Sequence, residues 1–506
     1  MKSNLLPALV ASLIVLAGPA LAAVRYVDIY STNPTPPYDS WPTAAVTIQD
    51  AVDAADPGDQ IIVTNGVYQS GGRIAVGTGS GSGSNRVAVT KPLVLQSVNG
   101  PEYTVIQAYS SPVTNLGVGA MRCVYLTNGA SLSGFTLANG ATWAPWGAGV
   151  WCQSSNLVVI SNCVLVSNFA GTRGAGAYGG TLVDCVIRSN STPPISSAGG
   201  GAWGSVLVNC TLVGNSSREG GGAAICTLTN CTLTGNQAIY GGGAAGSRLY
   251  NCLLTGNSAD DRGGGTFSCV LLNCTVTENS AGQYGGGVAG GSMFNSIIYF
   301  NTAPEGANYF ATPYSLCCTT PEGGAGFTNA PMFLNPASGN YRLQSNSPCI
   351  NAGNNASVVG STDLDGRMRI VAGAVDMGAY EVQPDVSGEF IGWLSGYHLP
   401  TDGSADYADV DADGHNAWQE WRADTNPTNA ASVLRLFPPA GSLEGVTVRW
   451  QSATTRNYFL ERSTNLGFQP AFYLLESNIP GVAGETSFTD TNAVGAGQFF
   501  YRVGMH

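Results

Sequence analysis

Between residues 162 and 301, hydrophobic and polar positions repeat one pattern seven times. Each copy is a short run rich in Leu, Val, Ile or Thr that starts at an Asn, or in one copy an Asp, and ends at a second Asn. The first position holds Asn162, Asp184, Asn209, Asn230, Asn251, Asn273 and Asn295, and the second holds Asn168, Asn190, Asn215, Asn236, Asn257, Asn279 and Asn301. A fixed period of about 22 residues indicates a solenoid in which each repeat is one coil.

The apolar runs are short and β-prone, as in Ser205 to Val213, and turn residues bound each of them. None holds the ten or more helix-favouring residues that a helical or leucine-rich repeat needs. Stacked coils then form parallel strands, each coil advancing by roughly 4.8 Å. The pattern therefore predicts an all-β fold, a parallel β-helix with regular coils over residues 140–301.

Residues one period apart lie above each other in such a stack, so the sequence predicts three structural columns. Asn tolerates left-handed backbone angles, and its amide can bond to the Asn of the next coil, which predicts amide ladders. Gly triplets mark tight bends of the backbone. The third column holds Cys163, Cys185, Cys210, Cys231, Cys252 and Cys274.

A fourth column varies in chemistry. Two residues after the third Gly of each triplet, or its equivalent, the chain carries Trp151, Tyr178 and Trp203 in successive coils. The preceding position is small or β-branched, so strand alternation sends these aromatic rings outward. An outward row of aromatic rings suits stacking against sugar faces. The alternative is that loops cover the rings.

Composition narrows the choice of partner and compartment. The chain of 506 residues has a net charge of −12 and only 10% charged residues, with no basic patch, so nucleic acid is not an expected partner. Residues 1–22 read as a secretory signal peptide, with an apolar run from Leu5 to Leu16 and cleavage after Ala22. No stretch is long enough for an ordinary transmembrane span. We expect a secreted or cell-surface monomer.

Thirteen cysteines in an exported chain raise the question of disulfides. In-register side chains of the Cys column point the same way, which favours small buried hydrophobes over bridges. Cys226 with Cys231, Cys269 with Cys274, and Cys317 or Cys318 with Cys349 remain open pairings.

Thr47 to Tyr68 reads as a short capped helix, a Pro57-Gly58 stop and a strand. This arrangement resembles the N-terminal cap of right-handed parallel β-helix proteins of the pectate lyase type. The resemblance implies a right-handed β-helix over residues 23–383, with the helix covering the exposed first coil.

Residues 328–381 contain N-A-P-M-F-L-N-P, D-L-D-G-R-M-R and V-D-M-G-A-Y-E. They resemble the closing module called the choice-of-anchor Q domain of secreted bacterial β-helix proteins. Its most chemical residues are Asp363, Asp365, Arg367 and Arg369, which we expect to form a buried network sealing the last coil rather than a catalytic site.

Residues 384–432 read as a linker with a calcium loop. Asp409, Asp411, Asp413, His415 and Glu420 occupy positions 1, 3, 5, 7 and 12 of a calcium-binding pattern, with Gly414 at the sharp turn. His415 would offer its carbonyl. Asn416 departs from the EF-hand pattern, so the loop resembles a dockerin-like or thrombospondin-type-three loop. The alternative is an acidic solvated linker.

Residues 433–506 contain several alternating runs, including V-T-V-R-W and F-F-Y-R-V, separated by turns. They predict a small antiparallel β-sandwich that resembles fibronectin type III domains. Adhesion or spacing is the usual role of such a domain.

Fewer residues support a catalytic function than support glycan binding. A lyase similar to pectate lyases needs clustered carboxylates for calcium and an Arg or Lys as base, and a hydrolase needs paired Asp residues. The candidates are Asp260, Asp261 and Arg262, although adjacent strand residues point to opposite faces.

We therefore expect a non-catalytic protein that binds extracellular polysaccharide or cell-surface glycan, or mediates adhesion. Its Asn and Gly rhythm is also similar to the repeats of bacterial polymorphic outer-membrane adhesins. The alternative function is a polysaccharide lyase, or a glycoside hydrolase, acting on uronate-rich polymers.

Overall fold

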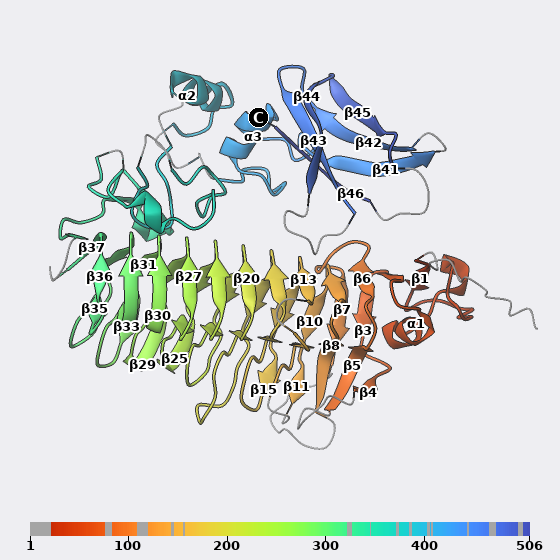
Figure 1. Cartoon of the computed structure of the whole chain (residues 1–506), viewed down its shortest axis with the longest axis horizontal. Helices are drawn as coiled ribbons and strands as arrows, with labels where there is room; N and C mark the ends of the chain where they lie inside the picture. The colour runs from red at the N-terminus through yellow and green to blue at the C-terminus, as the bar shows by residue number, and fades with distance from the viewer. Residues whose placement is uncertain are drawn as a thin grey trace, which may run out of the picture.

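A computed structural model describes residues 22–75, 83–108, 120–142, 146–154, 157–320, 326–344, 346–370, 374–383, 387–401, 405, 408–442, 445–464, 472–493 and 499–505. The signal peptide predicted over residues 1–22 lies outside these ranges except for Ala22. Within them, no helix is long and apolar enough to cross a membrane. Figure 1 shows a long stack of coils with the C-terminal units lying along one side of it.

The stack is a parallel β-helix, as the repeat predicts, and the strands of successive coils pair in register. One leg of the coils contains β1 (Val24–Val27), β2 (Gln60–Val63), β6 (Val94–Ser97), β9 (Ser131–Ser133), β13 (Val159–Ser161), β17 (Thr181–Val183), β20 (Val206–Val208), β23 (Thr227–Thr229), β27 (Arg248–Tyr250) and β36 (Tyr314–Ser315). A second leg contains β5 (Gly83–Val89), β8 (Met121–Leu126), β12 (Val150–Cys152), β16 (Ala177–Tyr178), β19 (Ala202–Trp203), β22 (Ala223–Ala224), β26 (Ala244–Ala245) and β35 (Tyr309–Phe310). Two longer strands, β30 (Thr266–Leu272) and β33 (Val288–Phe294), join these legs into one sheet, and β4 (Arg73–Ala75) pairs antiparallel with β5.

A third leg forms a separate parallel sheet. It contains β3 (Gly66–Tyr68), β7 (Thr104–Gln107), β10 (Thr136–Ala138), β14 (Val164–Val166), β18 (Val186–Arg188), β21 (Thr211–Val213), β24 (Thr232–Thr234), β28 (Leu253–Thr255), β31 (Thr275–Thr277), β34 (Ile297–Tyr299), β37 (Cys317–Thr319) and β38 (Gly326–Phe327). Short strands continue the turn after it, namely β11 (Ala141–Thr142), β15 (Phe169–Ala170), β25 (Gln237–Tyr240), β29 (Ser258–Arg262) and β32 (Ser280–Ala281).

The sequence predicted two roles for Asn, left-handed turns and amide ladders, and each Asn column has one of them. The first column sits at turns in the left-handed region, with φ of 52° at Asn230. The second column is buried and forms the predicted amide ladder. Asn236, for example, donates from Nδ2 to Oδ1 of Asn257 at 2.9 Å and accepts from Nδ2 of Asn215 at 3.0 Å. Each rung therefore ties one coil to the next inside the core.

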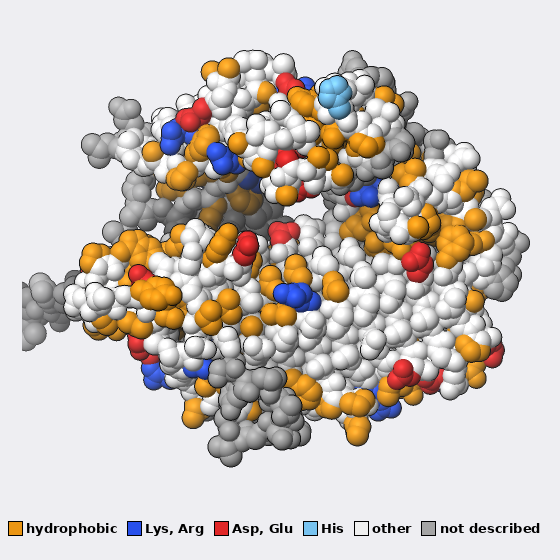
Figure 2. Space-filling model, turned by 180° about the vertical axis from the view of Figure 1, so that it is seen from behind, with side chains coloured by type: hydrophobic (Ala, Val, Ile, Leu, Met, Phe, Trp, Pro, Cys, Tyr) orange, Lys and Arg blue, Asp and Glu red, His pale blue; other side chains and the backbone are white. Residues whose placement is uncertain are grey.

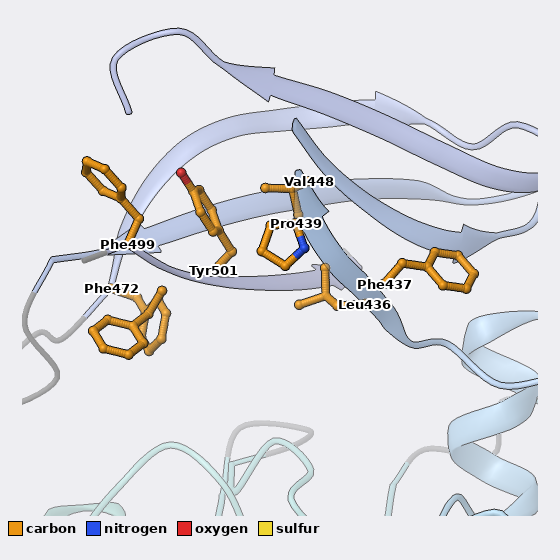
Figure 3. Close-up of a pocket in the computed structure, with 8 residues that line it drawn as sticks. Leu436, Phe437, Pro439, Val448, Phe472, Phe499 and Tyr501 are labelled. Carbon is orange, nitrogen blue, oxygen red and sulfur yellow. The ribbon is translucent and has the colours of Figure 1, made fainter. Parts of the chain in front are cut away.

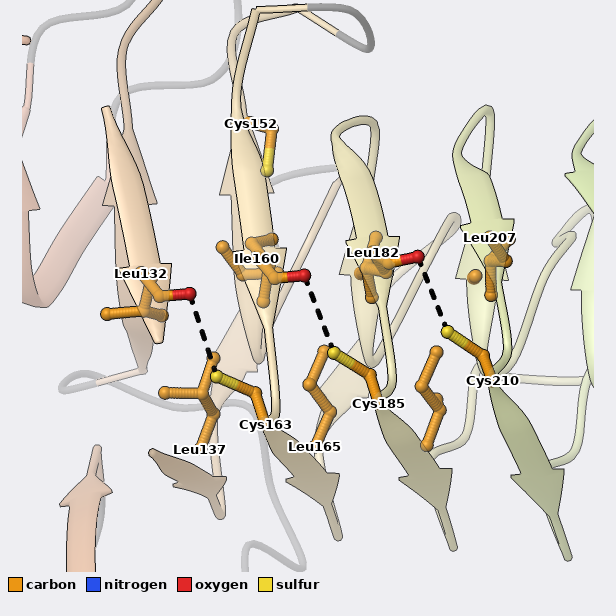
Figure 4. Packing of buried hydrophobic residues seen from close by; sticks show 14 of the residues in the cluster. Leu132, Leu137, Cys152, Ile160, Cys163, Leu165, Leu182, Cys185, Leu207 and Cys210 are labelled. Carbon is orange, nitrogen blue, oxygen red and sulfur yellow. Dashed lines mark hydrogen bonds between the residues drawn. The ribbon is translucent and has the colours of Figure 1, made fainter. Parts of the chain in front are cut away.

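The Gly and Cys columns also have structural causes. A Cβ on Gly221 would lie 2.2 Å from the carbonyl oxygen of Gln237, so the bend excludes any larger residue. The thirteen cysteines are all buried free thiols. In Figure 4, Sγ of Cys185 lies 3.6 Å from the carbonyl oxygen of Ile160 in the preceding coil, and Cys210 repeats this contact with Leu182 at 3.4 Å. The favoured interpretation of the column, small side chains filling a corner, agrees with this geometry.

The N-terminal cap forms as predicted. Oγ1 of Thr47 accepts a hydrogen bond from the backbone N–H of Asp50 at 3.2 Å and caps α1 (Ile48–Ala54). Ile48 and Val52 are buried in the main core, beneath the first coil's strands. The 3-10 turn η1 (Trp41–Thr43) precedes this helix.

Residues 328–381, here called the flank segment, lie along the side of the last coils (Figure 1) rather than over their end. They contain β39 (Phe333–Asn335), β40 (Asn340–Leu343) and the turns η2 (Pro336–Ser338) and η3 (Asn355–Ser357). Met377 and Tyr380 pack on Leu253 and Ile297 of the third leg. We expected this segment to cover the end of the last coil, and that location is wrong. The segment lies on the flank because its apolar side chains bury the outward apolar residues of β28 and β34.

The buried charge network expected in this segment is present. Asp363 accepts hydrogen bonds from the backbone N–H groups of Asp365, Arg367 and Glu381. Arg369 pairs with Glu381 at 3.4 Å, both side chains being fully buried, and Arg342 pairs with Asp365 at 2.5 Å. Burial raises the pKa of Asp363 to about 6, since the hydrogen bonds only partly offset the desolvation of the carboxylate.

Two helices and a sandwich follow. The helices are α2 (Ser387–Gly396) and α3 (Ala417–Ala423). One antiparallel sheet contains β41 (Leu436–Ser442), β42 (Gly445–Ser452) and β45 (Gly484–Asp490), and the other contains β43 (Asn457–Ser463), β44 (Tyr473–Pro480) and β46 (Phe500–Met505). Trp450 and Tyr458 are fully buried between them. The predicted small β-sandwich is present.

Candidate glycan-binding face and calcium loop

The outward aromatic column runs over four successive coils. Tyr125, Trp151, Tyr178 and Trp203 pair in register from β8 to β19. Their neighbours Val124, Val150 and Ala177 are fully buried in the main core, whereas the aromatic side chains form a separate cluster outside it. The strand alternation predicted from the sequence is therefore correct at these positions.

A second column lies beside the first and was not recognised in the sequence. Trp146 and Arg173 immediately precede Gly147 and Gly174, and they pair through an isolated parallel bridge. Each side chain of this column lies over the outward aromatic ring of the next coil. The ring of Trp146 stacks on Tyr178 with centroids 5.0 Å apart, and the guanidinium of Arg173 lies 4.9 Å from the centre of the Trp203 ring. Its sequence signal is the residue before each bend glycine.

The two columns together build one continuous stack, here called the aromatic face: Tyr125, Trp146, Trp151, Tyr178 and Trp203. Tyr178 and Trp203 are nearly parallel, with an interplanar angle of 12° and centroids 4.7 Å apart. Tyr125 and Trp151 are tilted by 52° at 4.9 Å. These distances match the spacing of adjacent strands, so the coil register itself sets the spacing of the rings.

Exposure divides the aromatic face into a covered and an open part. Tyr125 and Trp151 are only 7% and 8% exposed, because Trp146 and Ala88 pack against them. Trp146, Tyr178 and Trp203 are partly exposed, and Arg173 is exposed. The alternative considered for the sequence, covered rings, thus describes the buried Trp151. The open surface consists of Tyr178, Trp203, Trp146 and the Arg173 guanidinium.

Arg122 extends the stack toward the N-terminus as a buried cation. Its guanidinium lies 5.2 Å from the centre of the Trp151 ring, and its Nε donates to the carbonyl oxygen of Trp146 at 3.0 Å. Nη2 has no hydrogen-bond partner within the described part of the chain. Burial lowers the pKa of Arg122 to about 10, which leaves it charged at neutral pH.

The candidate catalytic trio does not converge on one point. Asp261 pairs with Arg262 at 3.3 Å, and the Arg262 guanidinium lies between the rings of Tyr240 and Tyr284 at 5.8 and 5.4 Å. Asp260 is exposed. Among the described residues, the single acidic cluster able to hold a metal ion lies elsewhere, at Asp409, Asp411 and Asp413.

The loop predicted to bind calcium brings its carboxylates together. Ligand oxygens of Asp409, Asp411 and Asp413 lie within 4.8 Å of one another. Oδ1 of Asp409 accepts from the N–H of Asp413 at 3.1 Å, and its Oδ2 accepts from Gly414 at 2.9 Å. Gly414 has φ of 95°, which explains the glycine at this turn.

Glu420 enters the same site from α3. Glu420 is only 1% exposed. Burial, and to a smaller extent the negative charges of Asp411 and Asp413, raise the pKa of Glu420 to about 7. Oε2 of Glu420, Oδ2 of Asp411 and Oδ2 of Asp413 are buried without a hydrogen-bond partner in the described structure. Unpaired buried carboxylate oxygens fit a hard cation that prefers oxygen ligands.

Asn416 explains the departure from the EF-hand pattern. It is the N-cap of α3, where its side chain accepts from the backbone N–H of Gln419 at 2.9 Å and its own backbone N–H donates to Oε1 of Gln419 at 2.9 Å. The eighth position of the loop is thus used to start a short helix, which carries Glu420 at position 12.

The sandwich carries an apolar pocket of about 330 Å³ between its two sheets (Figure 3). Pro439, Val448, Phe472 and Phe499 line it, and Tyr501 donates its hydroxyl to Asp490 at 2.9 Å.

Figure 2 shows the opposite side of the molecule, where charged side chains are sparse over the coils. Uncharged polar and apolar atoms dominate that surface, in keeping with the low charged fraction of the sequence.

No protein-family model matches the sequence, and no curated protein matches it. Among solved structures, the chain is similar to pectate lyase Pel9A, at 16% identity and a TM-score of 0.48 over 72% of this chain and 97% of that chain. Alginate lyase from Paenibacillus sp. str. FPU-7 matches at 12% identity and a TM-score of 0.27, over 56% of this chain and 96% of that chain. The Dettilon tailspike protein matches at 11% identity and a TM-score of 0.30, over 60% and 68%.

These likenesses concern the fold alone. The architecture of this chain is shown directly by the in-register parallel pairing of its own strands. The chain is therefore a parallel β-helix protein that carries a small C-terminal antiparallel sandwich.

Proposed function

We propose that this protein is exported and binds extracellular polysaccharide or cell-surface glycan through its aromatic face. The observation that carries the proposal is the open stack of Trp146, Tyr178 and Trp203, with Arg173 beside it. The stacked rings cover one another's faces, so they present their apolar edges to a glycan, and the adjacent guanidinium can donate hydrogen bonds to its oxygens. Rings repeated along the coil axis suit a polymer better than a single sugar.

The same surface supports binding rather than catalysis. The aromatic face has no carboxylate among the described residues that make it up, and the pair Asp261 and Arg262 belongs to a different group of coils. A general acid or base must reach the bond that reacts. The face can hold a glycan, and although Arg173 lies beside it, none of the described side chains that make it up is a carboxylate that could hold calcium for a lyase.

The calcium loop has a structural role in this proposal. Asp409, Asp411, Asp413 and Glu420 would hold Ca²⁺ through side-chain oxygens, with His415 offering its carbonyl. A bound Ca²⁺ supplies positive charge that neutralises the crowded carboxylates. Arg367 of the flank segment lies 4.8 Å from the ring centre of Trp418 on α3, so an ordered loop also orders this contact.

Glycan retention tests the proposal. In affinity electrophoresis through gels containing acidic or neutral polysaccharides, the double variant Tyr178→Ala/Trp203→Ala should lose the retardation that the unaltered protein shows. Trp41→Ala is the matched control, because Trp41 is 42% exposed in the N-terminal cap, away from the aromatic face. Retention that persists in the double variant would contradict the assignment of the face.

A second assay separates binding from the alternative function. The protein is incubated with uronate polymers and calcium, and ultraviolet absorbance reports unsaturated chain ends. We expect no increase. An increase that disappears in Arg262→Ala would replace the binding assignment with a lyase acting near Asp261 and Arg262.

A further inference from the structure

The chain enters the fold at Ala23, immediately after the cleavage position expected from the sequence. Ala22 is exposed, whereas the carbonyl oxygen of Ala23 already accepts a hydrogen bond from the N–H of Gln60 at 2.9 Å. From Val24 onward, β1 pairs in register with β2. The backbone is therefore fixed from the first residue that would remain after removal of residues 1–22.

The backbone nitrogen of Ala23 meets a buried carboxylate. It lies 2.7 Å from Oδ1 of Asp59, a residue that is 3% exposed. Oδ2 of Asp59 accepts from Nε and Nη2 of Arg25 at 3.1 and 2.9 Å and from the N–H of Asp56 at 3.0 Å. Oδ2 of Asp59 thus binds Arg25, and Oδ1 binds the nitrogen of Ala23.

We propose that cleavage between Ala22 and Ala23 creates an α-ammonium group that forms a partly buried ion pair with Asp59 and so completes the N-terminal cap. Hydrolysis consumes one water, leaves a carboxylate on Ala22 and an amino group on Ala23, and that amino group takes up a proton at neutral pH. The inference rests on the export proposed above. It adds a structural role for the terminus that cleavage after Ala22 would create.

The electrostatics favour the ammonium over an amide at this place. Burial of Asp59 works to raise its pKa, but the hydrogen bonds from Asp56 and Ala23 and the pairing with Arg25 outweigh it, so its pKa is lowered. The carboxylate is therefore charged at neutral pH. A charged donor at 2.7 Å strengthens the contact roughly twofold over a neutral N–H.

The position of the terminus decides whether this pair can form. If cleavage leaves even one residue before Ala23, the nitrogen facing Asp59 is an uncharged amide and the ammonium lies in solvent beyond the exposed Ala22. A chain that begins after Ala23 loses both the contact with Asp59 and the bond to Gln60. The geometry thus selects one first residue.

The charge of the new terminus also predicts a pH dependence. The α-ammonium pairs with Asp59 only in the folded chain, so its pKa in that state is raised above the value of about 7.7–8.0 for an unfolded chain. The stabilisation is complete below about pH 7.7 and is lost as the pH rises through the folded-state pKa. The other charged residues that contact Asp59 are Arg25, through its guanidinium, and Asp56, through its backbone N–H.

The amino groups of the processed chain make the pKa measurable. Lys2 and Lys91 are the only lysines, so the chain that begins at Ala23 has two amines, at Ala23 and Lys91. Trace labelling with an acylating reagent between pH 6 and 10, followed by mass spectrometry of the two peptides, reports the pKa of each. We expect the α-amino pKa of the folded chain to exceed that of the denatured chain by about one unit. Equal values would overturn the ion pair.

A variant cycle separates this pair from the effect of Arg25. Chains that begin at Ala23 or at Leu21 are prepared by removing a leader in vitro, so the comparison does not depend on export. We expect Asp59→Asn to lower the Tm of the Ala23 chain by about 2–4 °C more than that of the Leu21 chain, because the loss of the Arg25 contact is common to both. Asp56→Asn, a change of an exposed carboxylate in the same turn, should show no such difference.

The outcomes are distinct. Equal effects of Asp59→Asn on the two chains would overturn the ion pair, whatever the export experiment shows. If Asp59→Asn prevents folding of both chains, the labelling measurement on the unaltered chains still decides the question. Edman sequencing of the exported protein tests the processing site, and any first residue other than Ala23 would refute it.

Discussion

The guanidinium of Arg173 lies 4.9 Å from the centre of the Trp203 ring in the next coil, and Trp203 in turn lies flat on Tyr178. A cation thus borders the open end of the aromatic stack. Arg173 makes no ion pair within the described residues, so its charge is available to a ligand.

Arg173→Gln should weaken binding of acidic glycans more than binding of neutral ones. The substitution removes the positive charge with which an acidic glycan would pair, and an exposed ion pair contributes about 0.2–1 kcal/mol, so affinity for an acidic glycan should fall by up to roughly fivefold. Titration calorimetry at two salt concentrations checks this. Arg188→Gln, on the exposed side of β18, is the control. An equal loss for neutral and acidic glycans would show that the charge of Arg173 plays no part.

The sequence predicted the features that depend on coil register. Because identical positions stack one period apart, the spacing of Asn236 and Asn257 was enough to predict their hydrogen bond, and the spacing of Trp151 and Tyr178 was enough to place both rings outside. Periodicity converts a sequence separation into a spatial contact wherever the repeat is regular.

Features that depend on side-chain reach or on distant segments were not predictable in this way. Trp146 stacks on a residue of the next coil diagonally, so one column read alone does not reveal that Trp151 is covered. The hydroxyl of Tyr341 in the flank segment donates to Glu278 at 2.8 Å. The sequence around Tyr341 and the sequence around Glu278 give no sign that these two residues are partners. The segment was therefore expected at the end of the stack rather than on its flank.

Asn236→Leu should destabilise the β-helix strongly. The change removes the acceptor for the backbone N–H and Nδ2 of Asn215, both at 3.0 Å, and the donor to the carbonyl oxygen of Leu212. Each buried polar group left without a partner costs about 1–3 kcal/mol, so we expect a total of roughly 3 kcal/mol or more. Thermal unfolding followed by circular dichroism measures it.

Asn230→Gly in the same coil is the matched control. Asn230 has φ of 52° at a turn, a conformation that Gly adopts without strain, and the change removes only an amide contact with Asn251 at 3.2 Å. Its Tm should change little. A similar fall in Tm in both variants would mean that an Asn of the ladder contributes no more to stability than an Asn at a turn.

Removing calcium should loosen the unit around α3 while leaving the β-helix folded. Without the ion, Glu420 and the three Asp side chains repel one another in a partly buried site. Trp418 and Trp421 pack around Phe390 beside this loop, so their fluorescence should change on chelation and recover on adding Ca²⁺. At a concentration of 100 Kd, Ca²⁺ should stabilise the unit by about 2.7 kcal/mol.

Asp411→Asn should abolish the fluorescence response, because it removes charge from one of the three clustered carboxylates. Asp365→Asn, outside the loop, should retain it, since Asp365 pairs with Arg342. A response to chelation that survives in Asp411→Asn would place the ion elsewhere.

Asp363 makes the flank segment sensitive to pH in an unusual direction. Its pKa is about 6 in the folded chain, against 3.8 for an unperturbed Asp, so between those pH values the folded state binds more protons than the unfolded state. Stability from this group therefore falls as the pH rises from about 4 to 6 and stays low above it. A shift of this size corresponds to roughly 3 kcal/mol.

Asp363→Asn isolates that contribution. Asn cannot ionise, so its own stability should not change across this pH range, although it has one acceptor oxygen where Asp363 uses two. The difference in Tm between the unaltered protein and Asp363→Asn should then be larger at pH 4 than at pH 7. Other carboxylates, such as Asp59, contribute equally to both proteins and cancel in the difference. A difference in Tm that grows with pH would mean that the hydrogen bonds from Arg367 and Glu381 outweigh burial at this site.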